Sequence, residues 1–358
     1  MAGGQLAYSV VPSLGHDLAG HYENAKRVPA ILEALQQKRL TAAAQPQKMR
    51  KLQSRAASAA EIEAVHSSAH MAVMKRRAAE DAPCVIADFE CLPDNTTYMA
   101  PSSFDDALLA AGSALAAVDA VMDGSAKGFA LIRPPGHHAG RENPMGFCIF
   151  NNIAVAARYC QERHHLKRVM ILDFDVHHGN GTQDLFYEDD SVLYIDMHQQ
   201  EVWPGSGHAN EIGSGKGLGT TINVPMPVGS GHEAALKAFQ RIVKPATMRF
   251  APDVILVSAG YDAHRLDPLE HLNYQSATYY GLVSSLMSLA DELCEGRLVL
   301  LLEGGYNFQS LSEGVCNSFQ ALIGGQSLHE VDSSAPAEPE REVDEVISEV
   351  VAIHKLES

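Results

Sequence analysis

The chain has 358 residues, of which 46% are hydrophobic, so it is long enough to bury the core of one large domain. Acidic residues outnumber lysines and arginines by 44 to 27, which gives a formal net charge of -17. We therefore expect no direct binding of nucleic acid, because a phosphate backbone is held by an excess of lysine and arginine. No apolar run reaches the ~20 residues that span a bilayer, so we expect no membrane insertion either.

The cysteines are scattered along the chain, and none forms a Cys-x-x-Cys pair. This pattern favours reduced thiols in an intracellular, reducing compartment over a disulfide framework. Cytoplasm, nucleus, plastid and mitochondrion all meet that condition. The residues concerned are Cys84, Cys91, Cys148, Cys160, Cys294 and Cys316.

In chain order, predicted strands alternate with predicted helices. Apolar, β-branched runs indicate strands, and apolar residues at helical spacing indicate helices. Strands are expected at 6–11, 128–132, 169–174, 192–196, 253–258 and 298–302. Helices are expected at 23–35, 59–80, 101–122, 150–163, 232–250, 276–294 and 311–323, with a helical turn at 183–186. Ser102 or Ser103 is a suitable N-cap for the third of these helices.

This alternation predicts an α/β fold, with a mainly parallel, doubly wound sheet flanked by helices in a single domain. We place that domain at residues 1–328. The glycine-rich segment 201–231 has few spaced apolar residues and is predicted to be a long functional loop. Residues 329–358 form an acidic tail rich in Ser, Pro and Glu, and 343–356 are predicted to form a short amphipathic helix within it.

The segment 173–182 joins a buried strand to a group of polar side chains. It reads Asp-Phe-Asp-Val-His-His-Gly-Asn-Gly-Thr. If the chain stays extended there, Asp173, Asp175 and His177 point to one side while the apolar residues between them point into the core. Carboxylate oxygen and imidazole nitrogen are zinc ligands, and a site without thiolate is typical of catalysis. The alternative is a strand end with solvated acidic residues.

Polar, glycine-bearing loops follow four of the predicted strands. In open parallel sheets, ligands bind beyond the carboxyl ends of the strands, so these loops should meet at one edge of the sheet. The loops are 133–138 (Arg-Pro-Pro-Gly-His-His), 173–182, 259–264 (Ala-Gly-Tyr-Asp-Ala-His) and 303–307 (Glu-Gly-Gly-Tyr-Asn).

Together these four motifs resemble the zinc-dependent histone deacetylase family, its class II members most closely, and within them the plant-type branch with organellar members. The resemblance covers about residues 6–325. It implies an arginase/deacetylase-like fold with one zinc ion per chain. By position, it implies that Asp175, His177 and Asp262 hold the zinc. Three protein ligands leave room for water and a substrate oxygen.

The resemblance also assigns catalytic roles. His137 and His138 match the tandem histidines beside the metal-bound water, with His137 held by Asp173 and His138 by Asn180. Many family members carry Asp where this chain has Asn180, and a neutral partner favours the imidazolium less. Tyr306 matches the tyrosine that donates to the scissile carbonyl, although a packed core tyrosine is the more common role of that residue type.

Substrate contacts follow from the same resemblance. Gly146 and Phe147 match the wall of a narrow tunnel, and Trp203 matches a second aromatic residue across it. Leu269 stands where polyamine-selective relatives carry a glutamate, which disfavours an acetylpolyamine substrate. Thr96 lies near a rim position that contacts substrate backbone.

The resemblance also bears on a potassium ion and on the role of Arg27. Family members bind potassium through backbone carbonyls near the zinc ligands, so a potassium ion is possible here, with Asp196 close by. Arg27 could line the inner channel, although a salt bridge on a helix surface is the commoner role of such an arginine.

We therefore expect a zinc-dependent amidohydrolase that removes acetyl groups from lysine side chains of proteins, histone or non-histone. Small N-acetylated amines, such as an acetylpolyamine or an arylalkylamine, are the alternative substrates. An acetyl-lysine-binding scaffold with vestigial activity is a third possibility, and the oligomeric state stays open. A binuclear manganese hydrolase of arginase type would need more carboxylates and histidines than the four loops supply.

Overall fold

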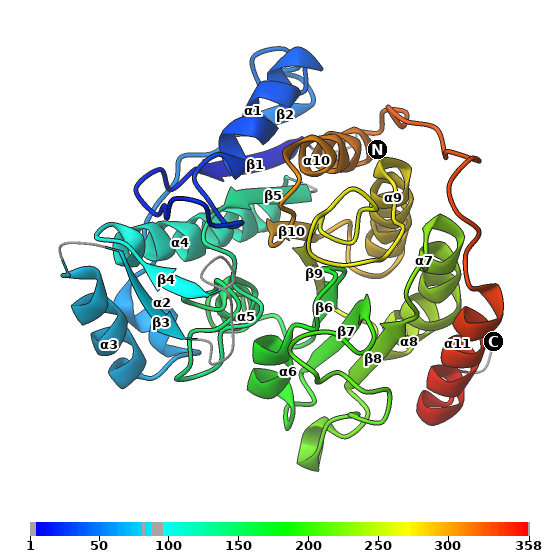
Figure 1. Cartoon of the computed structure of the whole chain (residues 1–358). Coiled ribbons are helices and arrows are strands. Elements are labelled where there is room, and N and C mark those ends of the chain that lie inside the picture. The colour runs from blue at the N-terminus through cyan, green and yellow to red at the C-terminus, as the bar shows by residue number, and fades with distance from the viewer. Residues whose placement is uncertain (1–4, 81–82, 88–95, 126, 357–358) are drawn as a thin grey trace.

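The structure is a computed structural model that describes residues 5–80, 83–87, 96–125 and 127–356. At its centre lies an eight-stranded sheet in which each strand is parallel to its neighbours, in the order β2-β1-β5-β10-β9-β6-β7-β8 (Figure 1). The strands are β1 Leu6–Val11, β2 Met49–Lys51, β5 Lys127–Ile132, β6 Val169–Asp173, β7 Val192–Gln199, β8 Thr221–Met226, β9 Val254–Ala259 and β10 Leu298–Leu302.

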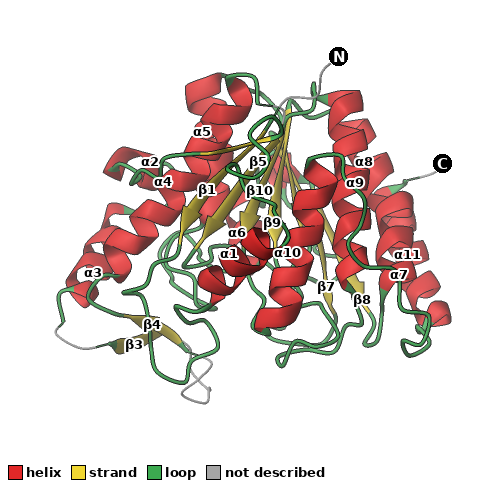
Figure 2. Ribbon diagram, turned by 90° about the horizontal axis from the view of Figure 1, so that it is seen from above, coloured by secondary structure: helices red, strands yellow, loops and turns green. Residues whose placement is uncertain are grey.

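Helices cover both faces of this sheet, so two hydrophobic cores form (Figure 2). Successive strand residues alternate between them: Met170 and Leu172 belong to the first core, Val169 and Ile171 to the second. The first core is covered by α1 Arg27–Gln37, α7 His232–Ala238, η2 Phe239–Val243, α8 Lys244–Phe250, α9 Ser276–Leu293, α10 Phe308–Leu322 and α11 Glu340–His354. The second is covered by α2 Ala59–Glu63, α3 Ser68–Ala78, α4 Ser103–Met122, α5 Asn152–His164 and α6 Asn180–Phe186. The predicted fold class is confirmed.

All six predicted strands are present, but the described ranges contain four further strands that were missed. Three of these are the edge strand β2 and the antiparallel pair β3 Cys84–Ala87 and β4 Thr97–Met99. The fourth, β8, lies inside segment 201–231, so the prediction of an uninterrupted loop was wrong. Asn223 and Pro225 weaken its strand pattern, and proline is tolerated because β8 is the last strand of the sheet.

Two predicted helices have different bounds in the structure. The helix expected at 23–35 begins only at Arg27, because Glu23 is turned into a buried ion pair and the Asn24 side chain accepts from the Lys26 N–H (3.0 Å). The helix expected at 59–80 is two helices. α3 starts after Ser67, whose hydroxyl accepts from the His70 N–H (3.1 Å) and so caps a new helix.

The other predicted helices lie within three residues of their expected ends. Segments α7, η2 and α8 follow one another without a break and together make up the helix expected at 232–250. Ser102 is the N-cap residue of α4, but its hydroxyl bonds to the Asp106 carboxylate (2.7 Å) instead of capping the helix.

The amphipathic helix predicted near the end of the chain is present as α11. Its apolar side, with Val343, Ile347 and Val350, is buried against β8, η2 and α7, so the helix completes one core (Figure 1). The boundary at residue 328 stays a prediction. None of the helices in the described ranges has both the length and the apolar character to cross a membrane.

The strand order explains why the four polar loops lie together. Strands β5, β10, β9 and β6 are consecutive neighbours in the sheet, and each is followed by one of the loops. Since all four strands run in the same direction, their carboxyl ends lie along one edge. The segments 133–138, 303–307, 259–264 and 173–182 are thus brought side by side from positions far apart in the chain.

A network of buried charges includes Arg133, the first residue of the loop after β5. The Glu23 carboxylate is fully buried and pairs with Arg133 at the end of β5 and with Arg27 at the start of α1. Burial alone would raise the pKa of Glu23, but the charge of Arg133 and a hydrogen bond from His16 hold it well below its usual range. One carboxylate therefore balances two buried guanidinium groups.

We predict that Glu23→Ala destabilises the protein by about 3–5 kcal/mol, because it leaves buried positive charge without a partner. Denaturant unfolding monitored by circular dichroism measures this free energy. The matched control is Glu345→Ala, which removes the carboxylate of an exposed pair with Arg341 and should cost about 1 kcal/mol or less. Equal unfolding midpoints for the two variants would contradict the prediction.

Candidate active site

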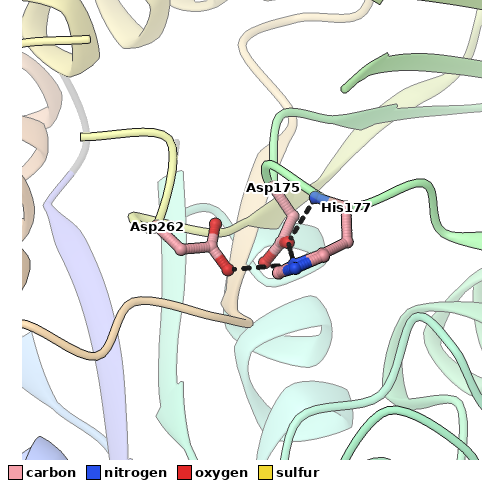
Figure 3. Close-up of side chains that lie close together, drawn as sticks. All are labelled: Asp175, His177 and Asp262. Atoms are coloured by element: carbon pink, nitrogen blue, oxygen red, sulfur yellow. Dashed lines mark hydrogen bonds and ion pairs between the residues drawn. The ribbon is translucent and has the colours of Figure 1, made fainter. Parts of the chain in front are cut away.

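Asp175, His177 and Asp262 converge at the ends of two neighbouring strands, β6 and β9 (Figure 3). One ligand atom of each lies within 4.8 Å of the others. The Nδ1 atom of His177 lies 3.2 Å from Oδ1 of Asp175 and 3.5 Å from Oδ2 of Asp262. The three residues that the resemblance named as metal ligands therefore form one cluster.

The cluster has the properties of a cation site. Oδ2 of Asp262 is buried and makes no hydrogen bond to any described residue, so an acceptor oxygen faces the cluster without a donor. Two buried carboxylates side by side repel each other unless a positive charge lies between them. Burial alone would lower the pKa of His177, but its hydrogen bond to Asp175 and the nearby Asp262 carboxylate raise that pKa to about 10. The site thus attracts a cation, and an oxygen, nitrogen, oxygen donor set suits zinc.

Backbone groups around the cluster fix the carboxylates. Oδ2 of Asp175 accepts from the Gly304 N–H (2.8 Å), and Oδ1 of Asp262 accepts from the Val176 N–H (2.9 Å). A side chain at Gly304 would not fit, since its Cβ would lie 2.0 Å from Oδ2 of Asp262. The close approach of the 303–307 loop therefore requires glycine there.

His137 and His138 lie next to the cluster, with ring centroids 3.9 Å apart, and each Nδ1 is held by the predicted partner. Nδ1 of His137 is 2.9 Å from Oδ2 of Asp173, and Nδ1 of His138 is 2.8 Å from Oδ1 of Asn180. The amide oxygen of Asn180 only accepts, so His138 donates through Nδ1, and its Nε2 carries the lone pair when the ring is neutral.

The two histidines differ in charge because their surroundings differ. Burial lowers the pKa of both rings. For His137 the carboxylates of Asp173 and Asp175 outweigh burial and raise the pKa well above its ordinary value. For His138 the charges of His137 and His177 add to burial, and the pKa falls well below it. One ring holds a proton while the other is free to accept one.

Sequence reasoning assigned no role to Glu303, which positions this histidine pair. Its buried Oε2 accepts from the Gly136 N–H (2.6 Å) and the His137 N–H (3.2 Å), and its Oε1 accepts from the Ser258 hydroxyl (3.2 Å). The carboxylate thereby ties the loop after β5 to strand β9. A glutamate directly after a buried strand is the signal that could have indicated this role.

Tyr306 faces the same pocket as the metal cluster, and its hydroxyl stays protonated. Burial raises the pKa of the phenol well above its usual value. The Arg27 guanidinium lies 4.9 Å from the ring centroid, and the Phe147 ring meets it edge to face at 5.7 Å. Arg27 is fully buried, so the alternative of a surface salt bridge is wrong.

The pocket has a volume of about 190 Å³ and leads to the cluster. Its lining brings together a predicted metal ligand, a predicted catalytic histidine and the predicted tunnel residues. The lining residues are His138, Gly146, Phe147, His177, Trp203, Leu269, Glu270 and Tyr306. A side chain at position 146 would collide with both walls, since its Cβ would lie 2.2 Å from the His138 ring and 2.8 Å from the Trp203 ring.

Two sequence predictions, the rim contact of Thr96 and potassium binding, stay untested, and one pocket residue was missed. Thr96 is 5% exposed, is not among the residues that line the pocket, and has its carbonyl 2.9 Å from Nε2 of His21, so its rim contact stays a prediction. Potassium binding also stays a prediction, and the Asp196 carboxylate bonds to the Gly179 N–H (2.8 Å) and to Nδ1 of His198 (2.8 Å). Glu270 was missed, although it directly follows Leu269 in the chain.

Comparisons with known proteins agree with this geometry. The family model described as "Histone deacetylase domain" matches residues 21–322. The chain is 45% identical to Histone deacetylase 14, chloroplastic, of Arabidopsis thaliana, over 99% of this chain and 86% of that protein. It is 44% identical to Histone deacetylase 10, chloroplastic, of Oryza sativa subsp. japonica, over 98% of this chain and 81% of that protein.

A human relative and a solved structure also match most of this chain. The human protein named Polyamine deacetylase HDAC10 is 38% identical over 84% of this chain, which spans 44% of that protein. The crystal structure of the HDA15 HD domain superposes with a TM-score of 0.85 at 33% identity, over 98% of this chain and 94% of that one. With the family model matching most of its length and two plant relatives aligned almost end to end, the chain belongs to the histone deacetylase family.

Proposed function

We propose that this protein is a zinc-dependent hydrolase that converts Nε-acetyl-lysine in proteins to lysine and acetate. The observation that carries the proposal is a pocket with aromatic walls, Phe147 and Trp203, that ends at a cation-binding cluster, a histidine pair and a tyrosine. Aromatic faces suit the aliphatic stem of a lysine side chain, and the polar end suits the neutral acetamide.

The cluster of Asp175, His177 and Asp262 would hold the zinc ion. When bound, zinc supplies Lewis-acid polarisation of the acetamide carbonyl and lowers the pKa of the attacking water. The family is generally zinc-dependent, and the buried Oδ2 of Asp262, which accepts no hydrogen bond from the described residues, supports a metal here.

The histidine pair carries the proton transfers of the hydrolysis. His138, neutral and with its Nε2 lone pair free, accepts a proton from water as the water oxygen bonds to the acetamide carbon. When the carbon–nitrogen bond then breaks, a histidine proton goes to the departing lysine nitrogen, so acetate and amine leave as balanced products. The raised pKa of His137, caused by Asp173 and Asp175 in spite of burial, makes its ring the cationic neighbour that stabilises developing negative charge.

Tyr306 stabilises the charge that develops on the carbonyl oxygen. Its phenol is protonated and so donates a hydrogen bond to that oxygen. Arg27 over the ring favours the orientation that faces the pocket.

A second substrate class, small acetylated amines, has one observation in its favour. The Glu270 carboxylate lines the pocket and would attract a second, cationic amine of such a substrate. The human relative named Polyamine deacetylase HDAC10 points the same way. Two observations favour the lysine substrate. Leu269 beside Glu270 carries no charge, and the Glu270 carboxylate already accepts a hydrogen bond from the Gln199 side-chain amide (3.2 Å). A scaffold without activity is disfavoured because no member of the catalytic set is missing.

For the compartment we propose a plastid. Two relatives that align over nearly the whole chain are named chloroplastic. Five of the cysteines are free thiols, in agreement with a reducing environment, and Cys91 lies outside the described residues.

Replacing a proposed metal ligand should remove the metal. We predict that Asp175→Ala or Asp262→Ala lowers the zinc content to about a tenth of wild type or less, since two ligands cannot complete a zinc site. Elemental mass spectrometry after dialysis measures zinc per chain. Asp253→Ala, at the opposite edge of the sheet, is the control and should retain zinc. Full zinc content in both ligand variants would refute the assignment.

Removing the Tyr306 hydroxyl should slow the chemical step. We predict that Tyr306→Phe lowers kcat on an acetyl-lysine peptide by ~10²-fold or more, the scale for one donor to a developing oxyanion. Zinc content and unfolding midpoint should stay at wild-type values. Turnover close to that of wild type would show that the phenol is not the donor.

Comparing kcat/KM for the two substrate classes, with and without the Glu270 carboxylate, tests which class the pocket prefers. Turnover of acetyl-lysine peptides, acetylpolyamines and acetylated arylalkylamines should give the highest kcat/KM for the peptides. We predict that Glu270→Gln lowers kcat/KM for an acetylpolyamine by ~5-fold, the scale of one partly exposed ion pair, with little effect on the peptide. A wild-type preference for the polyamine would favour the second substrate class over the first.

A further inference from the structure

Asp267 is a nearly buried carboxylate, 8% exposed, in the loop between β9 and α9. It accepts three backbone hydrogen bonds. Its Oδ2 accepts from the N–H groups of Tyr306 (2.7 Å) and Asn307 (3.1 Å), and its Oδ1 accepts from the N–H of Leu269 (3.3 Å).

These bonds join two loops that are distant in the chain and that line the same pocket. Leu269 lies on the loop that contains Asp267, and Tyr306 lies on the loop after β10. One carboxylate therefore sets the distance between the tunnel wall and the tyrosine. Two of the three donors lie on the loop after β10 and the third on the loop of Asp267 itself, so a single side chain fixes the spacing of the two loops.

Tyr306 depends on its backbone for its direction. It is followed by Asn307, whose side chain caps α10 by accepting from the N–H groups of Gln309 and Ser310 (3.1 Å each). It is preceded by Gly305, whose carbonyl accepts from Nε of Arg27 (2.7 Å). Asp267 supplies the bond in between, to the N–H of Tyr306 itself.

The side chain of Tyr306 is only partly buried, since one side of the ring faces the pocket. Packing alone therefore does not fix where its hydroxyl points. A shift of the backbone at Tyr306 would carry the phenol with it, and a 1 Å misplacement of a catalytic group is known to cost up to ~10²-fold in rate.

We propose that Asp267 is a positioning residue, which holds the Tyr306 hydroxyl and the Leu269 wall at the spacing that an acetamide requires. This inference rests on the proposed function, because it gives Asp267 its effect through Tyr306. Asp267 itself does not touch the substrate.

A double-mutant cycle tests this coupling, with kcat and KM measured for wild type, Asp267→Ala, Tyr306→Phe and the double variant. We expect Asp267→Ala to lower kcat by ~10- to 100-fold and to change KM much less. Once the hydroxyl is gone its position no longer matters, so in the Tyr306→Phe background the same substitution should cost less than ~2-fold. Asp267→Asn, which keeps an acceptor oxygen, should recover part of the rate.

The chain offers a matched control at the opposite edge of the sheet. Oδ2 of Asp253 accepts from two consecutive backbone N–H groups, those of Lys167 and Arg168, at 2.8 Å each. Asp253→Ala removes the same kind of link and should lower the unfolding midpoint without lowering kcat. Equal kcat losses for Asp267→Ala with and without the Tyr306 hydroxyl would overturn the proposal, as would a wild-type kcat.

A binding readout separates this inference from the proposed function. A dye-labelled alkyl hydroxamic acid chelates divalent metals and accepts a hydrogen bond through its carbonyl oxygen, so its affinity for the zinc-loaded protein also senses Tyr306. If wild type turns over no acetylated amine, the proposed function fails, and the same four variants are compared by fluorescence anisotropy. Loss of affinity on Asp267→Ala only when Tyr306 is present supports the positioning role, and additive losses overturn it.

Discussion

Two buried carboxylates beside one imidazole are the constraint on which the rest of the site depends. Asp175 and Asp262 repel each other, and the low-dielectric surroundings strengthen that repulsion. A positive charge between them relieves it, and the two carboxylates raise the pKa of His177 to about 10 in spite of burial. The adjacent strands β6 and β9, and the close approach of Gly304, keep the carboxylates together in spite of the repulsion. The fold thus maintains a site that is satisfied by binding a cation.

The same electrostatics shift the pKa values of two neighbouring histidines in opposite directions. His137 and His138 are adjacent in the chain and equally buried, yet Asp173 faces one and Asn180 faces the other. A charged partner stabilises an imidazolium, whereas a neutral amide only fixes the tautomer. One pair of identical side chains therefore has pKa values shifted in opposite directions. Glu303 fixes the backbone of this pair to the sheet, so the difference is maintained by buried hydrogen bonds.

Buried charged side chains also hold the loop after β10, which carries Tyr306. Glu23 and Arg133 anchor the first loop and the end of β5, and Arg27 reaches from that network to the carbonyls of Glu303 (2.5 Å) and Gly305 (2.7 Å). From the other side, Asp267 holds the N–H of Tyr306. The loop after β10 is therefore held between a guanidinium and a carboxylate, both of which bond to its backbone.

The sequence by itself determined the α/β architecture and the ligand types, because both depend on local pattern. Alternating apolar runs specify buried parallel strands, and the polar loops follow the carboxyl ends of those strands. The expectation of an extended chain through His177 was wrong, because β6 ends at Asp173 and residues 175–177 form a bend. Edge strand β8 was not predicted because its proline and asparagine weaken the strand pattern. The single helix predicted at 59–80 is two helices, because Ser67 caps the second one. Only the tertiary structure decided that β5, β10, β9 and β6 are neighbours and that Arg27 is buried over Tyr306. It also decided that Glu270 lines the pocket and that Asp267 accepts from the Tyr306 N–H. These roles arise from contacts between segments far apart in the chain, and no local spacing encodes such contacts.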